Sequence, residues 1–367
     1  MRLEYVGILL NDSIFRGIPA GRTQQEHLEF YEEAAHSCGL IPCYFRLKDI
    51  SLPERTVSAY IKSSSGFVLK TLPLPTVIHN RAIHQDQHSL QAIDGLLAAG
   101  IIVYNAQTRW GKDYIHRLLE QDPMISPYLP HTVLADSISV QSMLNLHGDI
   151  VIKPCSGSVG LGIMRLYRNR SGDFMTYSRA SRSMGGWRTI RITAHRSPGL
   201  LRSRIRKSPF LVQQRIPLAA FQGKPFDIRV TVQRGFGGEW GVTGMYAKTS
   251  APGTFVSNLA QGAAAYPVED PIRHAFPGIP PDQMLEHIAE SALLIAHSLS
   301  RHIPCAADFG LDIGIAEDGR LFFIECNGRD QRYGFRKAGL PDMWRETYRK
   351  PVAFARYLAD CGAWPVL

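Results

Sequence analysis

The sequence predicts a mixed α/β protein of two or three domains, and three observations support this class. Over residues 1–105, short apolar stretches alternate with amphipathic ones, which is typical of a parallel sheet covered by helices. From Asp149 onward the apolar stretches are punctuated by glycines, and a strand hairpin is expected between Ala306 and Glu325. With 367 residues, the chain is long enough for more than one hydrophobic core.

The order of elements follows from the same patterns. Strands are expected at Tyr5–Leu10, Ile41–Phe45, Gly66–Lys70, Thr76–His79 and Ile101–Tyr104, and helices at Gln24–Ser37, Gln87–Ala99, Lys112–Glu120 and Gln283–Ser300. Prolines at 123, 127 and 130 mark a linker. We therefore expect three domains, over residues 1–122, 123–210 and 211–367.

The composition excludes several classes of protein. Hydrophobic residues make up 45% and charged residues 20%, as in an ordinary globular protein, and no apolar run approaches the roughly 20 residues that span a bilayer. The N-terminal apolar stretch is too short for a signal peptide. Six cysteines without a CxxC pair indicate neither a zinc site nor a disulfide framework, so a reducing, cytoplasmic compartment is expected.

The positive charge of the chain is concentrated in one segment. Between Arg165 and Lys207 there are twelve Lys and Arg residues and one acid, whereas the net charge of the whole chain is +9. The Ser-, Arg- and Gly-rich part, Ser171–Ser208, is expected to be loop-like or partly mobile. Two interpretations stay open: a solvated basic insertion, or a surface for an anionic partner such as polyphosphate, an acidic polymer or nucleic acid.

A glycine-rich loop joins two expected strands. Asp149–Pro154 is an apolar strand that ends near Lys153, and Ile163–Tyr167 alternates as a second strand, so the glycines lie in a hairpin. Without side chains, such a loop can bring backbone N–H groups close to phosphate oxygens. It lacks the Gly-Lys-Ser/Thr of a Walker loop and does not open a helix as a dinucleotide-binding loop does. We interpret it as a hairpin that covers phosphates, with a purely structural turn as the alternative.

Two carboxylates are expected to face each other near the C-terminus. An Asp-Gly pair at 318–319, between two apolar runs, predicts a two-residue hairpin turn. Counting outward from that turn pairs Asp312 with Glu325 and Glu317 with Arg320. Like charges directly opposite each other destabilise a hairpin unless something compensates them.

An all-oxygen metal site would provide that compensation. Asn327 lies two residues beyond Glu325, so both side chains project from one face of the strand. Two carboxylates and an amide oxygen suit Mg²⁺ or Mn²⁺, which keep other positions for water and phosphates. The alternatives are two surface acids separated by solvent, or one protonated carboxyl, and a β-bulge would break the pairing.

Lys153 with its Ser-Gly-Ser loop, followed far downstream by Asp312, Glu325 and Asn327, resembles the ATP-grasp superfamily. Within it the chain looks most like the YheC/YheD family, described as associated with the coat of bacterial endospores. The resemblance covers nearly the whole chain. It implies the ATP-grasp fold: an N-terminal pre-ATP-grasp domain, then a small lobe with the glycine loop and a C-terminal lobe with the metal site, which together clamp ATP and Mg²⁺ (or Mn²⁺).

The resemblance also implies a role for individual residues. Lys153 would reach the α- and β-phosphates, and Arg229 would lie near the transferred phosphoryl group or the substrate. The backbone of an interlobe strand would bind the adenine edge, through Gln213, Gln214, Arg215 and Ile216. The other implied nucleotide and phosphate contacts are Lys112, Ser156, Gly157, Ser158, Gly160, Gly162, Asp227, Lys248, Ser257 and Asn258.

Structural alternatives stay open at several of these positions. Lys112 could be a helix surface lysine, and Asp227 and Arg229 could form an intrastrand pair. Lys248 could be a solvated strand end, and the Ser-Asn pair at 257–258 could be turn chemistry. The run 328–337 adds cations where related ligases often have Pro or Gly, which suggests either an anionic substrate or loop solvation.

The expected activity is phosphoryl transfer from ATP to a carboxylate, followed by attack of an amine or thiol on the acyl phosphate. Such chemistry depends on positioning and charge neutralisation, for which Lys153 and Arg229 are the candidate catalytic residues. A non-catalytic, nucleotide-binding protein of the spore surface is the alternative. A third possibility is a polyanion-binding module centred on Arg165–Lys207.

Overall fold

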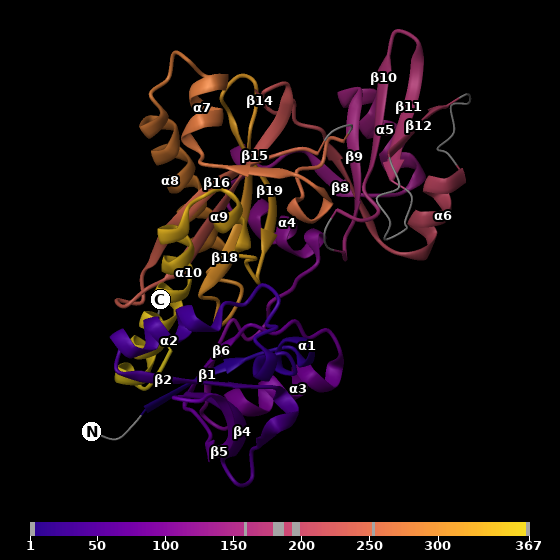
Figure 1. Cartoon of the computed structure of the whole chain (residues 1–367). Coiled ribbons are helices and arrows are strands. Elements are labelled where there is room, and N and C mark those ends of the chain that lie inside the picture. The colour runs from indigo at the N-terminus through magenta and orange to yellow at the C-terminus, as the bar shows by residue number, and fades with distance from the viewer. Residues whose placement is uncertain (1–3, 158–159, 179–186, 193–198, 252–253, 365–367) are drawn as a thin grey trace.

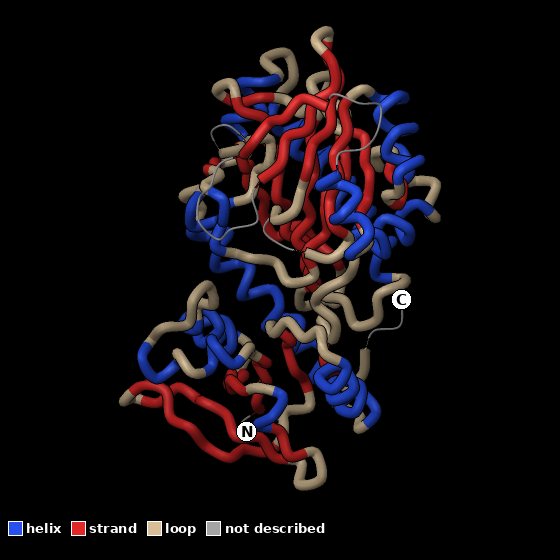
Figure 2. The backbone as a smooth tube through the Cα atoms, turned by 90° about the vertical axis from the view of Figure 1, so that its right-hand side faces the viewer, coloured by secondary structure: helices blue, strands red, loops and turns tan. Residues whose placement is uncertain are grey.

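The computed structural model describes residues 4–157, 160–178, 187–192, 199–251 and 254–364, and it contains three sheets (Figure 1). The N-terminal part of the chain forms the lower body in Figure 1, and the other two sheets lie above it and beside each other. Figure 2 shows the strands of the upper part running side by side with helices at their flanks. Within the described ranges, no helix is both long enough and apolar enough to cross a membrane.

The first sheet is mixed rather than purely parallel. Its parallel strands are confirmed as β1 (Glu4–Leu9), β2 (Leu40–Phe45), β6 (Val77–Asn80) and β7 (Ile102–Tyr104). The antiparallel strands β3 (Ile50–Ser51), β4 (Thr56–Ser63) and β5 (Gly66–Pro73) extend it, and only β5 was expected. The helices of this region are α1 (Asp12–Phe15), α2 (Leu28–Ser37), α3 (Gln87–Ala98) and α4 (Lys112–Glu120).

The predicted start of α2, at Gln24, is wrong, because the helix begins four residues later. Gln24 has a φ of +55°, in the left-handed region, so it cannot lie in an α-helix. Thr23 and Glu26 instead close a turn, and the helix begins at Leu28.

The second sheet carries the glycine hairpin. It is antiparallel throughout, in the order β12-β11-β10-β9-β13-β8. Its strands are β8 (Thr132–Leu134), β9 (Asp149–Pro154), β10 (Met164–Asn169), β11 (Gly172–Ser178), β12 (Trp187–Ile192) and β13 (Phe210–Gln214). Helices α5 (Ser137–His147) and α6 (Gly199–Lys207) accompany it. Because β13 pairs with β9, residues 210–214 belong to this sheet; the division into domains stays a prediction.

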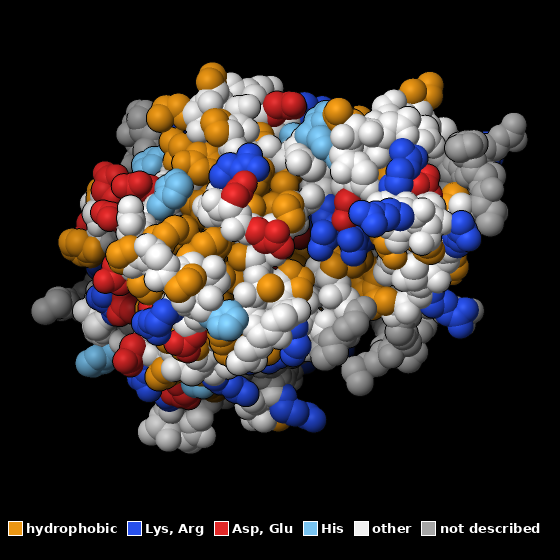
Figure 3. All heavy atoms as spheres, turned by 90° about the horizontal axis from the view of Figure 1, so that it is seen from above, with side chains coloured by type: hydrophobic (Ala, Val, Ile, Leu, Met, Phe, Trp, Pro, Cys, Tyr) orange, Lys and Arg blue, Asp and Glu red, His pale blue; other side chains and the backbone are white. Residues whose placement is uncertain are grey.

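The basic segment is structured in its described part, so the expectation of a loop over 171–208 is wrong there. Strands β11 and β12 pair with each other, and α6 follows. Two of its arginines are already paired, Arg165 with Asp149 at 2.7 Å and Arg168 with Asp173 at 2.7 Å. In Figure 3 the Lys and Arg side chains gather on the right, on the side where β9–β12 lie in Figure 1. An anionic partner for this surface stays a prediction.

The third sheet has one apolar and one polar face. Its order is β17-β16-β15-β18-β19, built from β15 (Lys224–Arg234), β16 (Trp240–Thr249), β17 (Ala264–Tyr266), β18 (Asp308–Ile315) and β19 (Leu321–Asn327), with β14 (Ala220–Phe221) beside β15. Side chains alternate along a strand, so Ile228, Val230 and Leu311 point to one face, where they pack in one core with residues of α8 (Pro281–Ser300). The opposite face, with Asp227, Arg229 and Asp312, is the one that is polar. Helix α7 (Glu269–Ala275) packs against α8.

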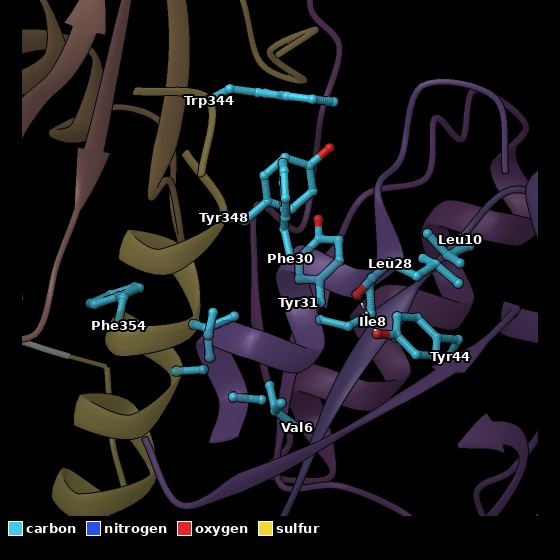
Figure 4. Packing of buried hydrophobic residues seen from close by; sticks show 14 of the residues in the cluster. Val6, Ile8, Leu10, Leu28, Phe30, Tyr31, Tyr44, Trp344, Tyr348 and Phe354 are labelled. Carbon is cyan, nitrogen blue, oxygen red and sulfur yellow. Dashed lines mark hydrogen bonds between the residues drawn. The ribbon is translucent and has the colours of Figure 1, made fainter. Parts of the chain in front are cut away.

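The C-terminal helix joins the third sheet to the N-terminal part. Helix α9 (Tyr333–Lys337) leads into α10 (Pro341–Cys361), which the sequence patterns did not reveal. Trp344 and Tyr348 of α10 stack edge-on against Phe30 of α2, with ring centroids 4.8 and 5.4 Å apart. Figure 4 shows these rings between α10 and α2. Because one hydrophobic core includes both ends of the chain, the N-terminal part is fixed relative to the third sheet.

A half-buried carboxyl in α2 should make the stability depend on pH. Burial raises the pKa of Glu32 to about 7, although the Tyr44 hydroxyl donates to its Oε1 at 2.8 Å. In the unfolded state the pKa of Glu32 has its ordinary value near 4.5. The contribution of Glu32 to stability is therefore fully present below pH 4.5 and is lost as pH rises through 7. We expect Glu32→Gln to be more stable than the parent at pH 8, by on the order of 2 kcal/mol, and similar at pH 4. Urea unfolding at both pH values measures this. The neighbouring Glu33→Gln, which changes an exposed charge, is the control and should show no such pH-dependent gain.

Candidate active site

A row of charged side chains crosses the polar face of the third sheet. Cross-strand pairing places Lys248 beside Asp227, Arg229 beside Asp312, and Asp312 beside Glu325. All of these side chains therefore point to the same face. The expected opposition of Asp312 and Glu325 is confirmed.

The prediction that a two-residue turn produces this pairing is wrong. Ala316 N–H donates to Arg320 O at 2.9 Å, so the loop contains three residues, ending in Gly319 with a φ of +84°. Ile315 therefore pairs with Leu321, one residue away from the expected register. A β-bulge at Ile324 restores the register before Asp312. Arg320 pairs with Asp318 at 2.8 Å, not with Glu317.

The buried cations of this face each have carboxylate partners. Arg229 donates to Asp312 through Nε (2.7 Å) and Nη2 (3.2 Å), and Lys248 Nζ lies 2.8 Å from Asp312 Oδ1. Lys248 also lies 3.0 Å from Asp227 Oδ1, and the Ser257 hydroxyl donates to Asp227 Oδ2. Lys248 is 5% exposed, so it is not a solvated strand end, and Asp227 and Arg229 have other partners rather than each other.

Burial and pairing act against each other on the two aspartates. Burial alone would raise the pKa of Asp312, but Arg229 and Lys248 outweigh it and lower the pKa to about 2. For Asp227, burial is the larger effect and raises the pKa, with Lys248 opposing it and the Asp312 charge adding to it. Burial lowers the pKa of Lys248, yet the attraction of both aspartates produces a net rise. Asp312 is thus the carboxylate that stays ionised at neutral pH and can serve as a metal ligand.

Glu325 forms an ion pair with Lys112. Lys112, the first residue of α4, donates from Nζ to Glu325 Oε1 at 2.9 Å, and its backbone N–H donates to Cys155 O at 2.9 Å. Lys112 is therefore not a free surface lysine. Protein cations thus offset the repulsion between Asp312 and Glu325, so the pairing does not by itself require a metal. The metal site stays a prediction.

The oxygens that remain free still suit a divalent cation. Each carboxylate oxygen has two lone pairs, so Asp312 Oδ2 and both oxygens of Glu325 keep acceptor capacity beside their protein donors. Asn327 donates through Nδ2 to Gly310 O at 3.3 Å, which leaves its amide oxygen for a cation. In the described part of the chain, no group of three or more His, Cys, Asp or Glu side chains could hold a metal, so a metal here needs the amide, water or phosphate as further ligands.

Lys153 points into the same site from the second sheet. Its Nζ donates to Gln213 Oε1 at 2.9 Å and to Ile324 O at 3.2 Å. Burial lowers the pKa of Lys153 to about 8, with Glu325 acting in the opposite direction. A desolvated ammonium group of this kind is suited to attract phosphate oxygens.

The glycine loop is confirmed as a hairpin connection between β9 and β10. Gly160 has a φ of +70°, and a Cβ there would lie 3.0 Å from Gln261 and 3.1 Å from Val256, so this loop touches the 254–262 segment. Lys112 Nζ lies 3.4 Å from Gly157 O. Ser158 lies outside the described residues.

The strand assigned to adenine contributes less free backbone than expected. Gln214 N–H donates to His131 O at 2.8 Å, and Arg215 N–H donates to Asp149 O at 3.1 Å. Arg215 also pairs with Asp149 at 3.2 Å. Gln213 and Gln214 are also paired with β9 in the sheet, so recognition of adenine by this backbone stays a prediction.

Ser257 and Asn258 have structural partners. Asn258 caps the short helix η4 (Leu259–Gln261) by accepting from Ala260 N–H at 2.8 Å, which is the turn chemistry held open as an alternative. Ser257 donates to Asp227, as described above. Both nevertheless line the cavity over the sheet.

Two adjoining cavities, which together we call the central cleft, bring most of the predicted residues together. They share Lys112, Lys153, Asp312 and Glu325 in their linings. The other predicted residues that line the cleft are Gly157, Gly160, Gln213, Gln214, Arg215, Ile216, Asp227, Arg229, Lys248, Ser257, Asn258 and Asn327. Ser156 and Gly162 are not part of the lining.

Several residues of the site were missed in the sequence. Asp330 is fully buried and accepts from Arg229 Nη1 at 2.8 Å and from the Thr231 hydroxyl. Arg109 and Arg329 line one end of the cleft. The only signal was the unusual run of charges after Asn327, which did not distinguish the residues that enter the cleft from those that do not.

Comparisons with known proteins agree with this geometry. A model of YheC/D-like ATP-grasp proteins matches residues 100–358. Endospore coat-associated protein YheD of Bacillus subtilis (strain 168) is 27% identical over 90% of this chain and 72% of its own length, and YheC of the same organism is 22% identical over 82% and 83%.

Solved structures share the fold. D-alanyl-alanine synthetase A of Vibrio cholerae O1 biovar eltor str. N16961 superimposes with a TM-score of 0.53 over 99% of this chain and 98% of that chain, at 12% identity. Because the family model covers most of the sequence, the protein belongs to the YheC/D-like ATP-grasp family.

Proposed function

We propose that the chain is an ATP-dependent ligase that activates a carboxylate as an acyl phosphate and joins it to an amine or a thiol. The main support is that two lysines and an arginine pair with Asp312 and Glu325, and that Lys153 and the glycine hairpin line the same cleft. Buried, paired charge at this density is typical of functional sites. Such an arrangement suits a triphosphate with its metal.

Each residue is given one task in this proposal. Lys153 and the glycine-loop amides bind the phosphates that become the leaving diphosphate, and Arg229 orients the γ-phosphoryl group. Asp312, Glu325 and Asn327 would hold Mg²⁺, which when bound neutralises charge on the β- and γ-phosphates. Lys112 and Lys248 hold the two carboxylates in place through ion pairs.

The proposed reaction needs no nucleophile from the protein. An oxygen of the substrate carboxylate attacks the γ-phosphorus, and the bond to the bridging oxygen breaks, releasing ADP. The amine nitrogen or thiol sulfur then attacks the acyl carbon, phosphate leaves, and the nucleophile loses its proton. Positioning in the cleft is what accelerates both steps.

The setting is also proposed from relatives. Two relatives are named as endospore coat-associated proteins, and we propose that this chain acts during formation of the spore coat. Its six cysteines are free thiols, which suits the reducing cytoplasm.

Trapping the acyl phosphate tests the proposal. The purified chain is incubated with Mg-ATP, pooled carboxylates and hydroxylamine, a nucleophile that converts acyl phosphates to hydroxamates. We expect ADP and hydroxamate in equal amounts, and the loss of both with EDTA or in Lys153→Met. Binding of Mg-ATP without ADP from any carboxylate would support the non-catalytic, nucleotide-binding alternative. Failure to bind Mg-ATP would refute both.

A further inference from the structure

We propose that the substrate carboxylate belongs to an acidic peptide, whose additional carboxylates are bound by Arg109 and Arg329 and by the cations of an adjoining cavity. The inference rests on the proposed ligase function and adds the class of substrate. It comes from the cations that the nucleotide site leaves unmatched.

Most cations in the central cleft already have a partner. Lys112 pairs with Glu325, and Arg229 pairs with Asp312 and Asp330. Lys248 is held by two aspartates, and Lys153 is the cation assigned to the phosphates. One of the two cavities that form the central cleft is lined by Arg229, and the remaining cations in its lining are Arg109 and Arg329.

Arg329 is a buried cation with weak compensation. Its side chain is 15% exposed, and its nearest carboxylate oxygen, Glu26 Oε1, is 3.7 Å away. That oxygen already accepts two bonds from Arg81, at 2.9 and 3.2 Å. Arg329 Nη1 has Asn11 Oδ1 at 3.3 Å, and its buried Nε has no hydrogen-bond partner in the described part of the chain. An anion in the cleft would supply a hydrogen-bond acceptor for Nε and a negative charge for the guanidinium group.

Arg109 lies at the same end of the cleft. A Cβ on Gly328 would lie 2.9 Å from Thr108 O and against the ring of Trp110, so the loop that carries Arg329 touches the segment that carries Arg109. With the Gln85 amide turned so that its oxygen faces Arg109, that oxygen accepts from Arg109 Nη1 and, at 3.1 Å, from Nε, and Arg109 forms no ion pair within the described residues. Two guanidinium groups at one end of a cavity favour a carboxylate between them.

A further cavity adjoins the central cleft. Tyr333 lines both, and the further cavity is also lined by Arg22, Arg336 and Lys337. Its two carboxylates are paired elsewhere, Glu26 with Arg81 and Glu29 with Lys62.

Tyr333 connects the two groups of cations. It lines both cavities, and Lys337 Nζ lies 5.3 Å from its ring centre. An extended peptide repeats side chains on one face about every 7 Å, so a peptide that crosses Tyr333 would present several acidic side chains along a path lined by both groups of cations.

Binding of a labelled peptide tests this inference. Fluorescein-labelled tetraglutamate is titrated into the full chain with Mg-ADP, and its anisotropy is compared with that of labelled tetraglutamine. We expect tetraglutamate to bind at least about tenfold more tightly, and Arg109→Gln and Arg329→Gln each to weaken it about tenfold. Arg336→Gln with Lys337→Gln should weaken tetraglutamate and leave a labelled Glu-Glu dipeptide unaffected. Arg273→Gln, an exposed charge outside both cavities, is the control and should change neither.

The outcomes separate this inference from the proposed function. If Mg-ADP does not bind, the ligase proposal fails first. If Mg-ADP binds but tetraglutamate is held no better than tetraglutamine, or Arg109→Gln binds it normally, the acidic-peptide inference alone is overturned. Should Arg329→Gln fail to fold, Arg329→Lys retains the charge, and Arg109, which is only partly buried, keeps the test decisive.

Discussion

Replacing Asp312 with asparagine and Glu325 with glutamine together is expected to abolish Mg-dependent nucleotide binding and to lower turnover by about 10³-fold. This factor corresponds to roughly 4 kcal/mol of transition-state stabilisation. Both carboxylates are ligands in the proposed metal site, and asparagine and glutamine retain their shape without a carboxylate charge. Calorimetric titration with Mg-ADP and the ADP-release assay measure the two effects.

The two single variants separate metal binding from folding. Asp312 also neutralises Arg229 and Lys248, so Asp312→Asn should lower stability as well as binding. Glu325 is 31% exposed at its side chain, so Glu325→Gln should keep the melting temperature and lose the Mg²⁺ dependence. Asp318→Asn, in the turn of the same hairpin, is the matched control and should bind Mg-ADP normally. Normal Mg-ADP binding by a folded Glu325→Gln would contradict the metal assignment.

The facing carboxylates show how a correct prediction can rest on a wrong step. An Asp-Gly pair indicates a hairpin, but the sequence does not distinguish a two-residue turn from a three-residue turn that ends in a left-handed glycine. The longer turn shifts the register by one residue, and the bulge at Ile324 shifts it back. Asp312 and Glu325 therefore meet as expected. Bulges depend on packing around the strand, which a single sequence does not reveal.

Local patterns identified elements better than they identified partners. Alternation and glycine placement were enough for β9, β10, β18 and β19, because each strand carries its own period. Both partners of Asp330, Arg229 and Thr231, come from β15, far away in the sequence, and no local pattern encodes such contacts. The polar, charged helix α10 was missed, since its apolar residues face two different parts of the protein, α2 and the third sheet.

Replacing Asp330 with asparagine should destabilise the chain by about 3 kcal/mol and disable Arg229. Its carboxylate is fully buried and holds Arg229 Nη1 at 2.8 Å and the Thr231 hydroxyl. Removing one partner of a buried ion pair costs about 3–5 kcal/mol, and the lower end applies because Arg229 keeps Asp312. Urea unfolding gives the loss in stability. The ADP-release assay should show a fall in turnover, since Arg229 is no longer fixed from two sides.

Two further variants test whether Asp330 acts through its position. Gly310 lies under Asp330, and a Cβ there would come within 2.4 Å of Asp330 Oδ1, so Gly310→Ala should displace that carboxylate and reproduce the loss. Gly278→Ala, where a Cβ meets nothing within 4 Å, is the matched control. Thr231→Val removes one donor and leaves the ion pair, so it should cost only about 1 kcal/mol. If Asp330→Asn unfolds at the same urea concentration as the parent, Asp312 alone holds Arg229, and the buried pair contributes nothing to the site.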